Sequence, residues 1–173
     1  MGNYKELLKQ ITTFIFDYDG VLTEGIVWLT EEGEPFRTAN VKDGYALQLA
    51  IKKGYRIAVI SGGKSNSVLN RLKSLGINDI FLGVEHKVDA FKEYLAENAI
   101  STDEVLYMGD DIPDFKPMQL AAVAACPADA AEEIRAISHY ISHFNGGKGC
   151  VRDIIEQVMK LQHKWMKDDA FKW

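Results

Sequence analysis

The chain has 173 residues, a length that suits one domain with a single hydrophobic core. Its formal net charge of −5 argues against a nucleic-acid-binding protein, and no apolar run is long enough to cross a membrane. The two cysteines, Cys126 and Cys150, lie on separate segments without metal-ligand spacing, so we expect free thiols in a reducing compartment.

The elements that the sequence predicts alternate between β-rich runs and helical patterns. The first residues lack the apolar core of a signal peptide, which predicts a cytoplasmic protein. Two β-rich runs at about 25–41 flank a polar, glycine-containing turn and predict a β-hairpin. The other predicted strands are 14–16, 56–60, 79–82, 104–108, 123–126 and 140–142, and the predicted helices are 4–10, 43–54, 65–75, 86–98, 113–121, 130–137 and 151–165.

This alternation predicts an α/β fold, a three-layer doubly wound parallel sheet of the Rossmann-like kind with helices on both faces. We see no internal repeat or linker. The whole chain, 1–173, is therefore expected to form one domain, with the hairpin as an insertion and a C-terminal helix and tail over about 150–173.

Polar residues follow several of the predicted strands. Because the carboxyl ends of parallel strands meet at one edge of a sheet, these groups are expected to lie together. A carboxylate cluster can hold Mg²⁺, a hydroxyl and an ammonium can hold phosphate oxygens, and a further carboxylate can attack or shuttle protons. The residues concerned are Asp17, Asp19, Ser61, Lys87, Asp110, Asp111 and Asp114.

Each of these residues also has a structural interpretation. Asp17 and Asp19 with Gly20 are typical of an acidic turn, and Ser61 before two glycines is typical of a turn cap. Lys87 alone is an ordinary surface lysine, and Asp114 alone is a first-turn acid of the helix after Pro113. Only their order along the chain favours a site.

Together, Asp17-Tyr-Asp-Gly-Val-Leu-Thr23, Ser61, Lys87 and Gly109-Asp-Asp-Ile-Pro-Asp114 resemble the four motifs of the haloacid dehalogenase superfamily of phosphotransferases. The resemblance runs from Thr13 to the C-terminal helix, nearly the whole chain. It implies the superfamily's fold and a phosphatase that requires Mg²⁺.

The resemblance also implies a role for each motif residue. Asp17 is the nucleophile that forms an aspartyl-phosphate, and Asp19 protonates the departing oxygen and later activates water. Mg²⁺ lies between Asp17, the backbone carbonyl of Asp19 and Asp110. Ser61 bonds a phosphoryl oxygen, Lys87 neutralises the transferring group, and Asp111 and Asp114 support the metal ligands and orient Lys87.

The chain has no room for the superfamily's cap domain, and only the hairpin lies in the first gap. Either a large substrate covers the site or neighbouring subunits do. The apolar residues of the hairpin favour the second option, since exposed apolar surface usually marks an interface. The alternative is that they pack on their own domain. The residues concerned are Ile26, Val27, Trp28, Leu29 and Phe36.

Within the capless members, Val21-Leu-Thr-Glu-Gly25, Asn40-Val-Lys-Asp-Gly-Tyr45, Ile60-Ser-Gly-Gly63 and Gly146-Gly-Lys-Gly-Cys-Val-Arg152 are similar to the 3-deoxy-D-manno-octulosonate 8-phosphate phosphatase family. This similarity implies a cytoplasmic homotetramer with shared hairpins, acting on a small sugar acid phosphate in lipopolysaccharide biosynthesis, without nucleic-acid or membrane partners. The alternatives are a nine-carbon keto-deoxy sugar acid 9-phosphate as substrate, a non-catalytic tetramerising module, and a broad phosphatase for protein or nucleotide phosphates.

Candidate substrate contacts are less defined. Lys64, Lys148 and Arg152 are candidates for the sugar carboxylate, and Asn40, Lys42, Gly62 and Gly63 belong to the same motifs. The family's usual Thr-Gly-Arg is Ser61-Gly-Gly-Lys64 here, so its arginine is missing. The glycine-rich loop 145–149 is either an anion site at a helix N-terminus or a chain reversal. His139 and His143 do not share one face, and we expect both to be structural.

Overall fold

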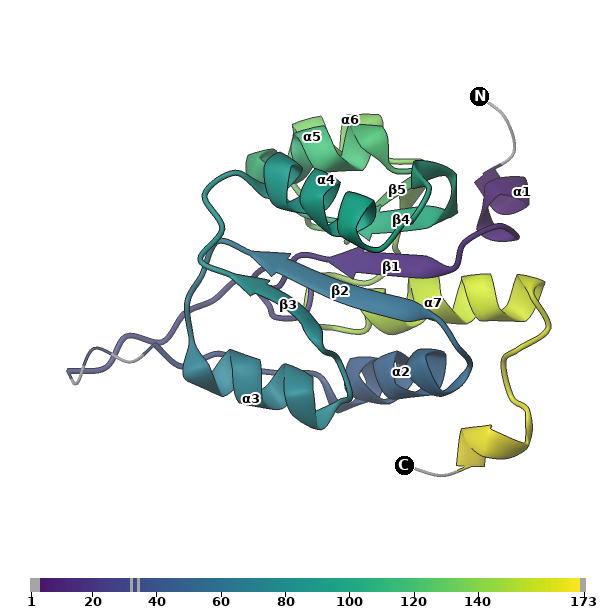
Figure 1. Ribbon diagram of the computed structural model, residues 1–173. Coiled ribbons are helices and arrows are strands. Elements are labelled where there is room, and N and C mark those ends of the chain that lie inside the picture. Colours follow the sequence, from purple (N-terminus) through teal and green to yellow (C-terminus); the bar gives the residue numbers. More distant parts are fainter. Residues whose placement is uncertain (1–3, 32, 34, 172–173) are drawn as a thin grey trace.

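The computed structural model describes residues 4–31, 33 and 35–171 (Figure 1). Six parallel strands form one sheet in the order β3-β2-β1-β4-β5-β6. The strands are β1 (Thr13–Phe16), β2 (Arg56–Ser61), β3 (Asp79–Leu82), β4 (Val105–Met108), β5 (Val123–Cys126) and β6 (Tyr140–Ile141). The order reverses on the two sides of β1, and in such sheets ligands bind beyond the carboxyl ends of the strands at this point.

Helices cover both faces of the sheet, which confirms the predicted doubly wound α/β fold (Figure 1). Helices α4 to α6 lie on one face and α2, α3 and α7 on the other. The helices are α1 (Tyr4–Leu8), α2 (Val41–Lys52), α3 (Asn66–Ser74), α4 (Lys87–Glu97), α5 (Phe115–Leu120), α6 (Glu132–Ile137) and α7 (Cys150–Leu161), with 3₁₀ turns at Thr102–Glu104, Ile112–Asp114 and Asp168–Phe171. Among the described residues, no helix has the length and apolar character needed to span a bilayer.

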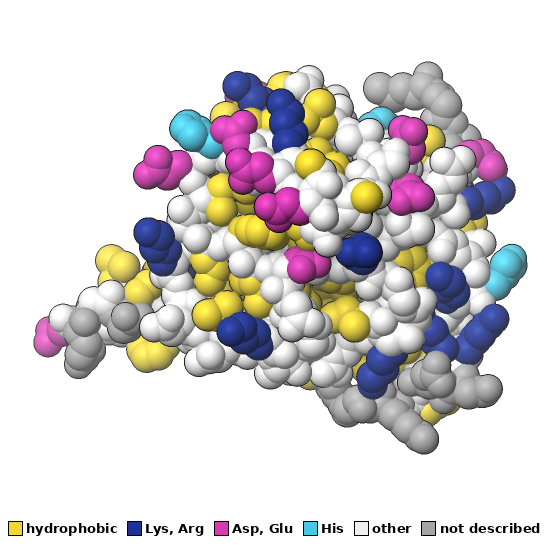
Figure 2. Space-filling model, in the orientation of Figure 1, with side chains coloured by type: hydrophobic (Ala, Val, Ile, Leu, Met, Phe, Trp, Pro, Cys, Tyr) yellow, Lys and Arg dark blue, Asp and Glu magenta, His cyan; other side chains and the backbone are white. Residues whose placement is uncertain are grey.

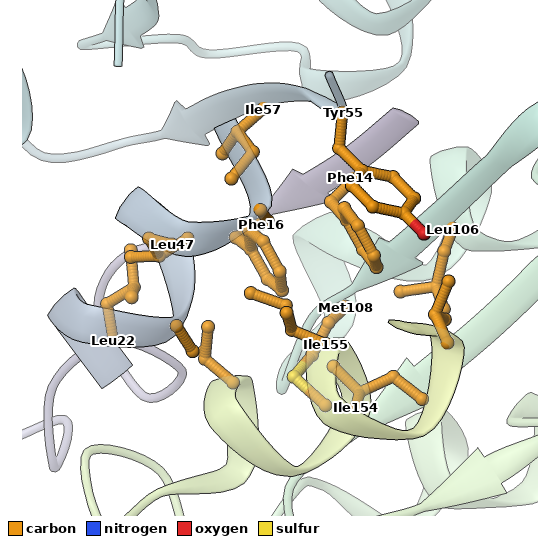
Figure 3. Packing of buried hydrophobic residues seen from close by; sticks show 14 of the residues in the cluster. Phe14, Phe16, Leu22, Leu47, Tyr55, Ile57, Leu106, Met108, Ile154 and Ile155 are labelled. Atoms are coloured by element: carbon orange, nitrogen blue, oxygen red, sulfur yellow. The ribbon is translucent and has the colours of Figure 1, made fainter. Parts of the chain in front are cut away.

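The central strand β1 is buried on both sides because helices pack on each face of the sheet. Phe14 and Phe16 pack toward α2 and α7, where Leu47 and Ile155 meet them (Figure 3), and Ile15 packs on the opposite face. Burying an apolar side chain of this size contributes about 1.5–3 kcal/mol. Strand β1 is thereby fixed, and with it the position of the residues that follow it.

The C-terminal helix is held to α2 by Asp43. Its Oδ1 accepts a hydrogen bond of 2.7 Å from the backbone N–H of Arg152 in the first turn of α7, where the preceding residue Gly149 offers no side chain as a cap. Burial raises the pKa of Asp43 to about 6, although backbone hydrogen bonds from Arg152 and Gly149 oppose the shift. Asn40 caps α2 and also donates from Nδ2 to the carbonyl of Gly147 at 3.0 Å. Both residues fasten the loop 145–149 to the start of α2.

Most predicted elements differ from the observed ones by one or two residues at an end, and the hairpin and helix α7 differ by more. Only an isolated antiparallel bridge between Trp28 and Phe36 stands where a hairpin was expected, and part of its turn, residues 32 and 34, lies outside the described residues. Helix α2 starts at Val41 instead of 43 because Asn40 accepts from the N–H groups of the first turn. Helix α7 ends at Leu161 instead of 165, and His163 has a φ of 56°, which breaks the helical path. Of the predicted tail, residues 172–173 lie outside the described residues.

The remaining expectations concern cysteine and histidine. Cys126 and Cys150 are both free and buried, as expected. His139 accepts a hydrogen bond at Nδ1 from the backbone N–H of Ala124 at 3.0 Å, which confirms a structural role for it.

Candidate active site

A cavity of about 380 Å³ lies at the carboxyl ends of β1, β2 and β4. Most of the residues that the sequence singled out line it together. They are Asp17, Asp19, Ser61, Gly62, Gly63, Lys87, Asp110, Asp111 and Asp114. Asp17 directly follows β1 and continues its ladder, since its N–H donates to the carbonyl of Met108 at 3.0 Å.

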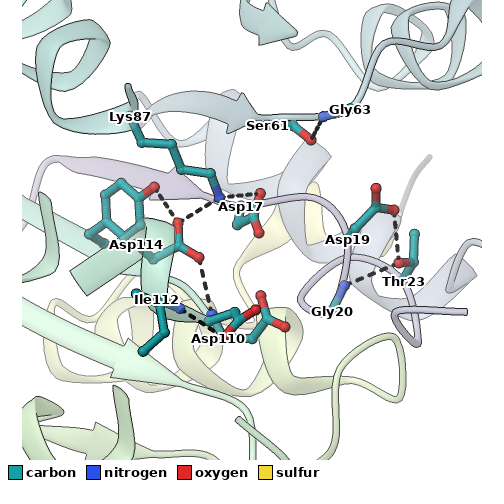
Figure 4. Close-up of polar contacts among 12 residues, drawn as sticks. Asp17, Asp19, Gly20, Thr23, Ser61, Gly63, Lys87, Asp110, Ile112 and Asp114 are labelled. Atoms are coloured by element: carbon teal, nitrogen blue, oxygen red, sulfur yellow. Dashed lines mark hydrogen bonds and ion pairs between the residues drawn. The ribbon is translucent and has the colours of Figure 1, made fainter. Parts of the chain in front are cut away.

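Lys87, the first residue of α4, is the buried cation of this cavity (Figure 4). Its Nζ lies 2.9 Å from Oδ1 of Asp17 and 2.8 Å from Oδ1 of Asp114, and its side chain is 5% exposed. Burial alone would lower the pKa of Lys87, but the charges of Asp114 and Asp17 outweigh it and raise that pKa. The ammonium therefore stays charged and ties the nucleophile candidate to Asp114.

Asp114 is fully buried and saturated with hydrogen bonds. Its Oδ1 accepts from Lys87 and, at 2.7 Å, from the hydroxyl of Tyr107, while its Oδ2 accepts from the N–H of Asp110 at 3.4 Å. A side chain at Gly109 would start 2.3 Å from Cβ of Asp114, so only glycine fits above this carboxylate. The arrangement makes Asp114 an anchor for Lys87.

Oxygen atoms of Asp17, Asp110 and Asp114 lie within 4.8 Å of one another, the spacing of a metal site. Burial, followed by repulsion among these carboxylates, raises the pKa of both Asp17 and Asp110. Oδ1 of Asp110 is buried and has no hydrogen-bond partner among the described residues. A hard divalent cation such as Mg²⁺ would supply that partner and relieve the repulsion, so the residues fit the ion. Asp17 and Asp110 have the free oxygens for it, whereas those of Asp114 are engaged.

Gly20 gives the loop after β1 its shape. Its φ is 85°, and a Cβ atom there would lie 1.9 Å from Oδ2 of Asp110. Thr23 accepts hydrogen bonds at Oγ1 from the N–H groups of Gly20 and Gly25, at 3.3 and 3.2 Å, and donates to Oδ1 of Asp19 at 3.4 Å. The loop thus brings Asp19 to the cavity mouth and lets Asp110 approach the backbone.

Ser61 caps a turn, as its structural interpretation predicted, and it also lines the cavity. Its Oγ accepts from the N–H of Gly63 at 3.2 Å in the turn after β2. Asp111 is exposed, and its Oδ1 accepts from the N–H of Ile112 at 2.8 Å. Asp111 therefore starts the 3₁₀ turn that carries Asp114.

Of the candidate sugar contacts, Gly62 and Gly63 line this cavity, whereas the four basic residues do not. Lys64 lies over Gly83, where a Cβ atom would be 2.1 Å from Cε of the lysine. Lys42, Lys148 and Arg152 surround a separate cavity of about 480 Å³ beside α7. The basic candidates therefore lie in two different places, Lys64 against Gly83 and the other three beside α7.

Three N–H groups of the loop 145–149 donate to oxygen atoms of the protein itself. The N–H of Gly146 donates to Asp129, that of Gly147 to the carbonyl of Val21, and that of Lys148 to the carbonyl of Asn145. A Cβ atom at Gly146 would lie 1.9 Å from the carbonyl oxygen of Gly20. The geometry favours the chain reversal over the anion site, and the loop forms the floor under the loop that follows β1.

Two residues of the site, Tyr107 and Arg37, were not predicted from the sequence. Tyr107 is buried in β4 and bonds Asp114, and a tyrosine in a strand carries no signal of such a role. Arg37 donates from Nε to Oδ1 of Asp19 at 2.7 Å. The sequence feature that could have indicated a role for Arg37 is that it is the single arginine in the β-rich run 35–41.

No protein-family model matches the chain. Curated relatives do match. The 3-deoxy-D-manno-octulosonate 8-phosphate phosphatase of Salmonella typhi is 33% identical over 156 residues, which cover 90% of this chain and 83% of that protein.

Solved structures agree with these relatives. The 3-deoxy-D-manno-octulosonate 8-phosphate phosphatase of Moraxella catarrhalis, solved with a magnesium ion, a phosphate ion and a KDO molecule, has a TM-score of 0.92 and 33% identity, and the match covers 95% of each chain. The phosphatase of the same name from Yersinia pestis also has a TM-score of 0.92, with 29% identity, over 94% of this chain and 88% of that one. The chain belongs to the 3-deoxy-D-manno-octulosonate 8-phosphate phosphatase family of the haloacid dehalogenase superfamily.

Proposed function

We propose that this protein is a Mg²⁺-dependent phosphatase that hydrolyses 3-deoxy-D-manno-octulosonate 8-phosphate to 3-deoxy-D-manno-octulosonate and phosphate. The observation that carries the proposal is the buried cluster in which Lys87 holds Asp17 while Asp110 keeps an unpaired oxygen beside it. The names of its relatives and the ligands in the Moraxella catarrhalis structure support the same substrate.

In this proposal Asp17 attacks the phosphorus atom and becomes an aspartyl-phosphate, which water then hydrolyses. Asp19, at the cavity mouth, gives a proton to the departing sugar oxygen and later takes one from the water. Ser61 donates its hydroxyl proton to a phosphoryl oxygen, and Lys87 offsets the negative charge of the transferring group.

Asp17, Asp110 and the backbone carbonyl of Asp19 are the proposed ligands of Mg²⁺. When bound, the ion would reduce the repulsion between the carboxylate nucleophile and the phosphate anion. Asp114 holds Lys87 in place, and Asp111 starts the turn that carries Asp114.

The test is phosphate release, with Mg²⁺, from the eight-carbon ester and from the nine-carbon keto-deoxy sugar acid 9-phosphate side by side. Asp17→Asn is the blank, and Asp89→Asn is the control because it changes an exposed aspartate on α4. We expect release from the eight-carbon ester in wild type and control only, and its loss when a chelator removes the metal. Preference for the nine-carbon ester would move the protein to that substrate, and wild type equal to the blank would leave a non-catalytic module.

We also propose a homotetramer in which neighbouring chains cover the site. Four apolar side chains between residues 25 and 37 support this, since they are more than half exposed, and Figure 2 shows hydrophobic atoms on this projecting segment. They are Ile26, Trp28, Leu29 and Phe36, with exposed fractions of 58%, 65%, 88% and 64%. Leu29→Asp should yield a monomer in light scattering, whereas Leu120→Asp, at an exposed leucine of α5, should not.

The proposed unit is one phosphatase domain over 1–173 that supplies a sugar acid for lipopolysaccharide in the cytoplasm. The buried free thiols of Cys126 and Cys150 support a reducing compartment.

A further inference from the structure

Arg37 is a partly buried cation close to the edge of the active-site cavity. It belongs to the segment that projects from the domain, but its side chain is only 10% exposed and its Nε donates to Oδ1 of Asp19 at 2.7 Å. The hydrogen bond to Asp19 raises the pKa of Arg37, although burial opposes the shift. The guanidinium is therefore charged and fixed against the residue proposed as the acid.

Asp19 uses the Nε position of this guanidinium. Nη1 is buried and has no hydrogen-bond partner within the described part of the chain. A buried charged donor without an acceptor is unfavourable, and proteins keep such groups where a ligand completes the bond. The fork of Arg37 can hold Asp19 through Nε and still bind a second carboxylate end-on through Nη1 and Nη2.

The free end of the fork lies beside the cavity. Nη2 is 3.3 Å from the place of a Cβ atom on Gly63, and Oδ2 of Asp19 is also 3.3 Å from it. Gly63 and Asp19 both line the cavity, so Arg37 stands directly behind its rim. A side chain at position 63 would press on the guanidinium, and glycine leaves that approach open.

The cavity otherwise lacks a cation for an acidic leaving group. Among the described residues that line it, Lys87 is the only lysine or arginine, and it is engaged by Asp17 and Asp114. Position 63 is glycine where the family's Thr-Gly-Arg has arginine, and Lys64 lies over Gly83. Among the described residues, Arg37 is therefore a basic partner that stands beside this cavity for a second negative group on the substrate.

We propose that Arg37 is a specificity-determining residue that orients Asp19 through Nε and binds the carboxylate of the leaving group through Nη1 and Nη2. The inference rests on the proposed function and deepens it, since it assigns recognition of the sugar acid's carboxylate to one residue. One side chain thereby couples recognition of the sugar acid to the placement of the proton donor.

The test compares the sugar acid ester with ribose 5-phosphate, a sugar phosphate that lacks the carboxylate. For Arg37→Met we expect KM for the sugar acid ester to rise about 10- to 100-fold, the range for loss of a charge-assisted hydrogen-bond pair. KM for ribose 5-phosphate should not change, while kcat should fall for both because Asp19 loses its partner. Arg37→Lys should retain part of the effect, since an ammonium keeps the charge without the fork.

The control is Arg56→Met, which removes an exposed arginine at the opposite, amino-terminal end of β2 and should leave both substrates unaffected. Equal changes of KM for the two substrates in Arg37→Met, or no change for either, would overturn the inference. Thermal unfolding of each variant shows that it is folded, and Arg37→Lys replaces Arg37→Met if the latter does not fold.

Calorimetric binding of the sugar acid product separates this inference from the proposed function, because it needs no turnover. Inactive wild type with product binding that weakens in Arg37→Met or Arg37→Lys would refute the phosphatase and support Arg37 as the carboxylate site. Product binding that is the same in wild type and variants would overturn the role of Arg37 even in an active enzyme.

Discussion

Lys87→Met should reveal how much the buried cluster depends on one cation. The substitution keeps a long apolar stem and removes the charge that lies 2.9 Å from Asp17 and 2.8 Å from Asp114. Removing one partner from a buried ion pair destabilises a protein by about 3–5 kcal/mol, because the remaining charge is left in a poorly solvated place. The side chains of Lys87 and Asp114 are 5% and 0% exposed, so solvent screening reduces this figure little.

The loss should depend on pH. Burial and mutual repulsion already raise the pKa of Asp17 and Asp110, and the charge of Lys87 opposes that shift. A carboxyl whose folded pKa lies above its unfolded value favours folding when protonated, and this contribution is lost as the pH rises through the folded pKa. In Lys87→Met the folded pKa values of Asp17 and Asp110 should rise further. The free energy of unfolding should therefore fall by about 3–5 kcal/mol at about pH 8, where the carboxyls are charged, and by less than half of that at about pH 5.

Urea unfolding of the metal-free protein at both pH values measures this difference. Lys92→Met is the control because Lys92 is exposed on the same helix. Added Mg²⁺ should restore part of the stability, since an ion that binds only the folded state stabilises it. Equal losses at the two pH values, or a loss below about 1 kcal/mol at the higher one, would refute the account of the cluster.

Three further predictions concern hydrogen bonding, backbone shape and pH. Tyr107→Phe should cost about 1.5–3 kcal/mol in urea unfolding and also lower kcat, whereas Tyr94→Phe, which removes a similar bond to a carboxylate outside the site, should leave kcat unchanged. Equal kcat values in Tyr107→Phe and Tyr94→Phe would contradict the prediction for Tyr107. Gly20→Ala should abolish Mg²⁺ binding in calorimetry because its Cβ would overlap a carboxylate, whereas Gly54→Ala, with a φ of 87° and open space around it, should cost only about 1–2 kcal/mol. Retained Mg²⁺ binding in Gly20→Ala would show that the loop after β1 can shift to accommodate the added Cβ atom. The folded pKa of Asp43 is raised to about 6, so protonated Asp43 stabilises the wild type at low pH and this contribution is lost as the pH rises. The contribution amounts to about 2 kcal/mol between about pH 4 and pH 7, and Asp43→Asn should remove this part of the pH dependence of the free energy of unfolding. An unchanged pH slope would mean that this carboxyl does not titrate upon unfolding.

The placement of the site was predictable because it follows from topology. Once Phe14 to Phe16 is a central parallel strand, Asp17 must stand at its carboxyl end, and the residue after the neighbouring strands must stand beside it. The order of the motifs then brings Lys87 and Asp110 to the same edge. The order of strands and helices can be predicted from the hydrophobic periodicity and the turn residues, which are local features of the sequence.

Side-chain direction was not predictable in the same way. Lys64 and Gly63 are adjacent, yet one lies away from the cavity over Gly83 and the other lines it. Arg37 stands in a run whose composition is typical of a strand, and only the fold of the projecting segment turns it toward Asp19. Asn40 carried a capping signal that the β-rich neighbours obscured.

The floor of the site consists of residues that are far apart in sequence. Gly146 packs against the carbonyl of Gly20, and Gly147 bonds to Val21 on one side and to Asn40 on the other. A nascent chain contains β1 and Asp17 long before these glycines leave the ribosome. The loop after β1 therefore acquires its final shape only with the last helix, so that removal of this late segment should disrupt the proposed site although Asp17 and Asp19 are still present.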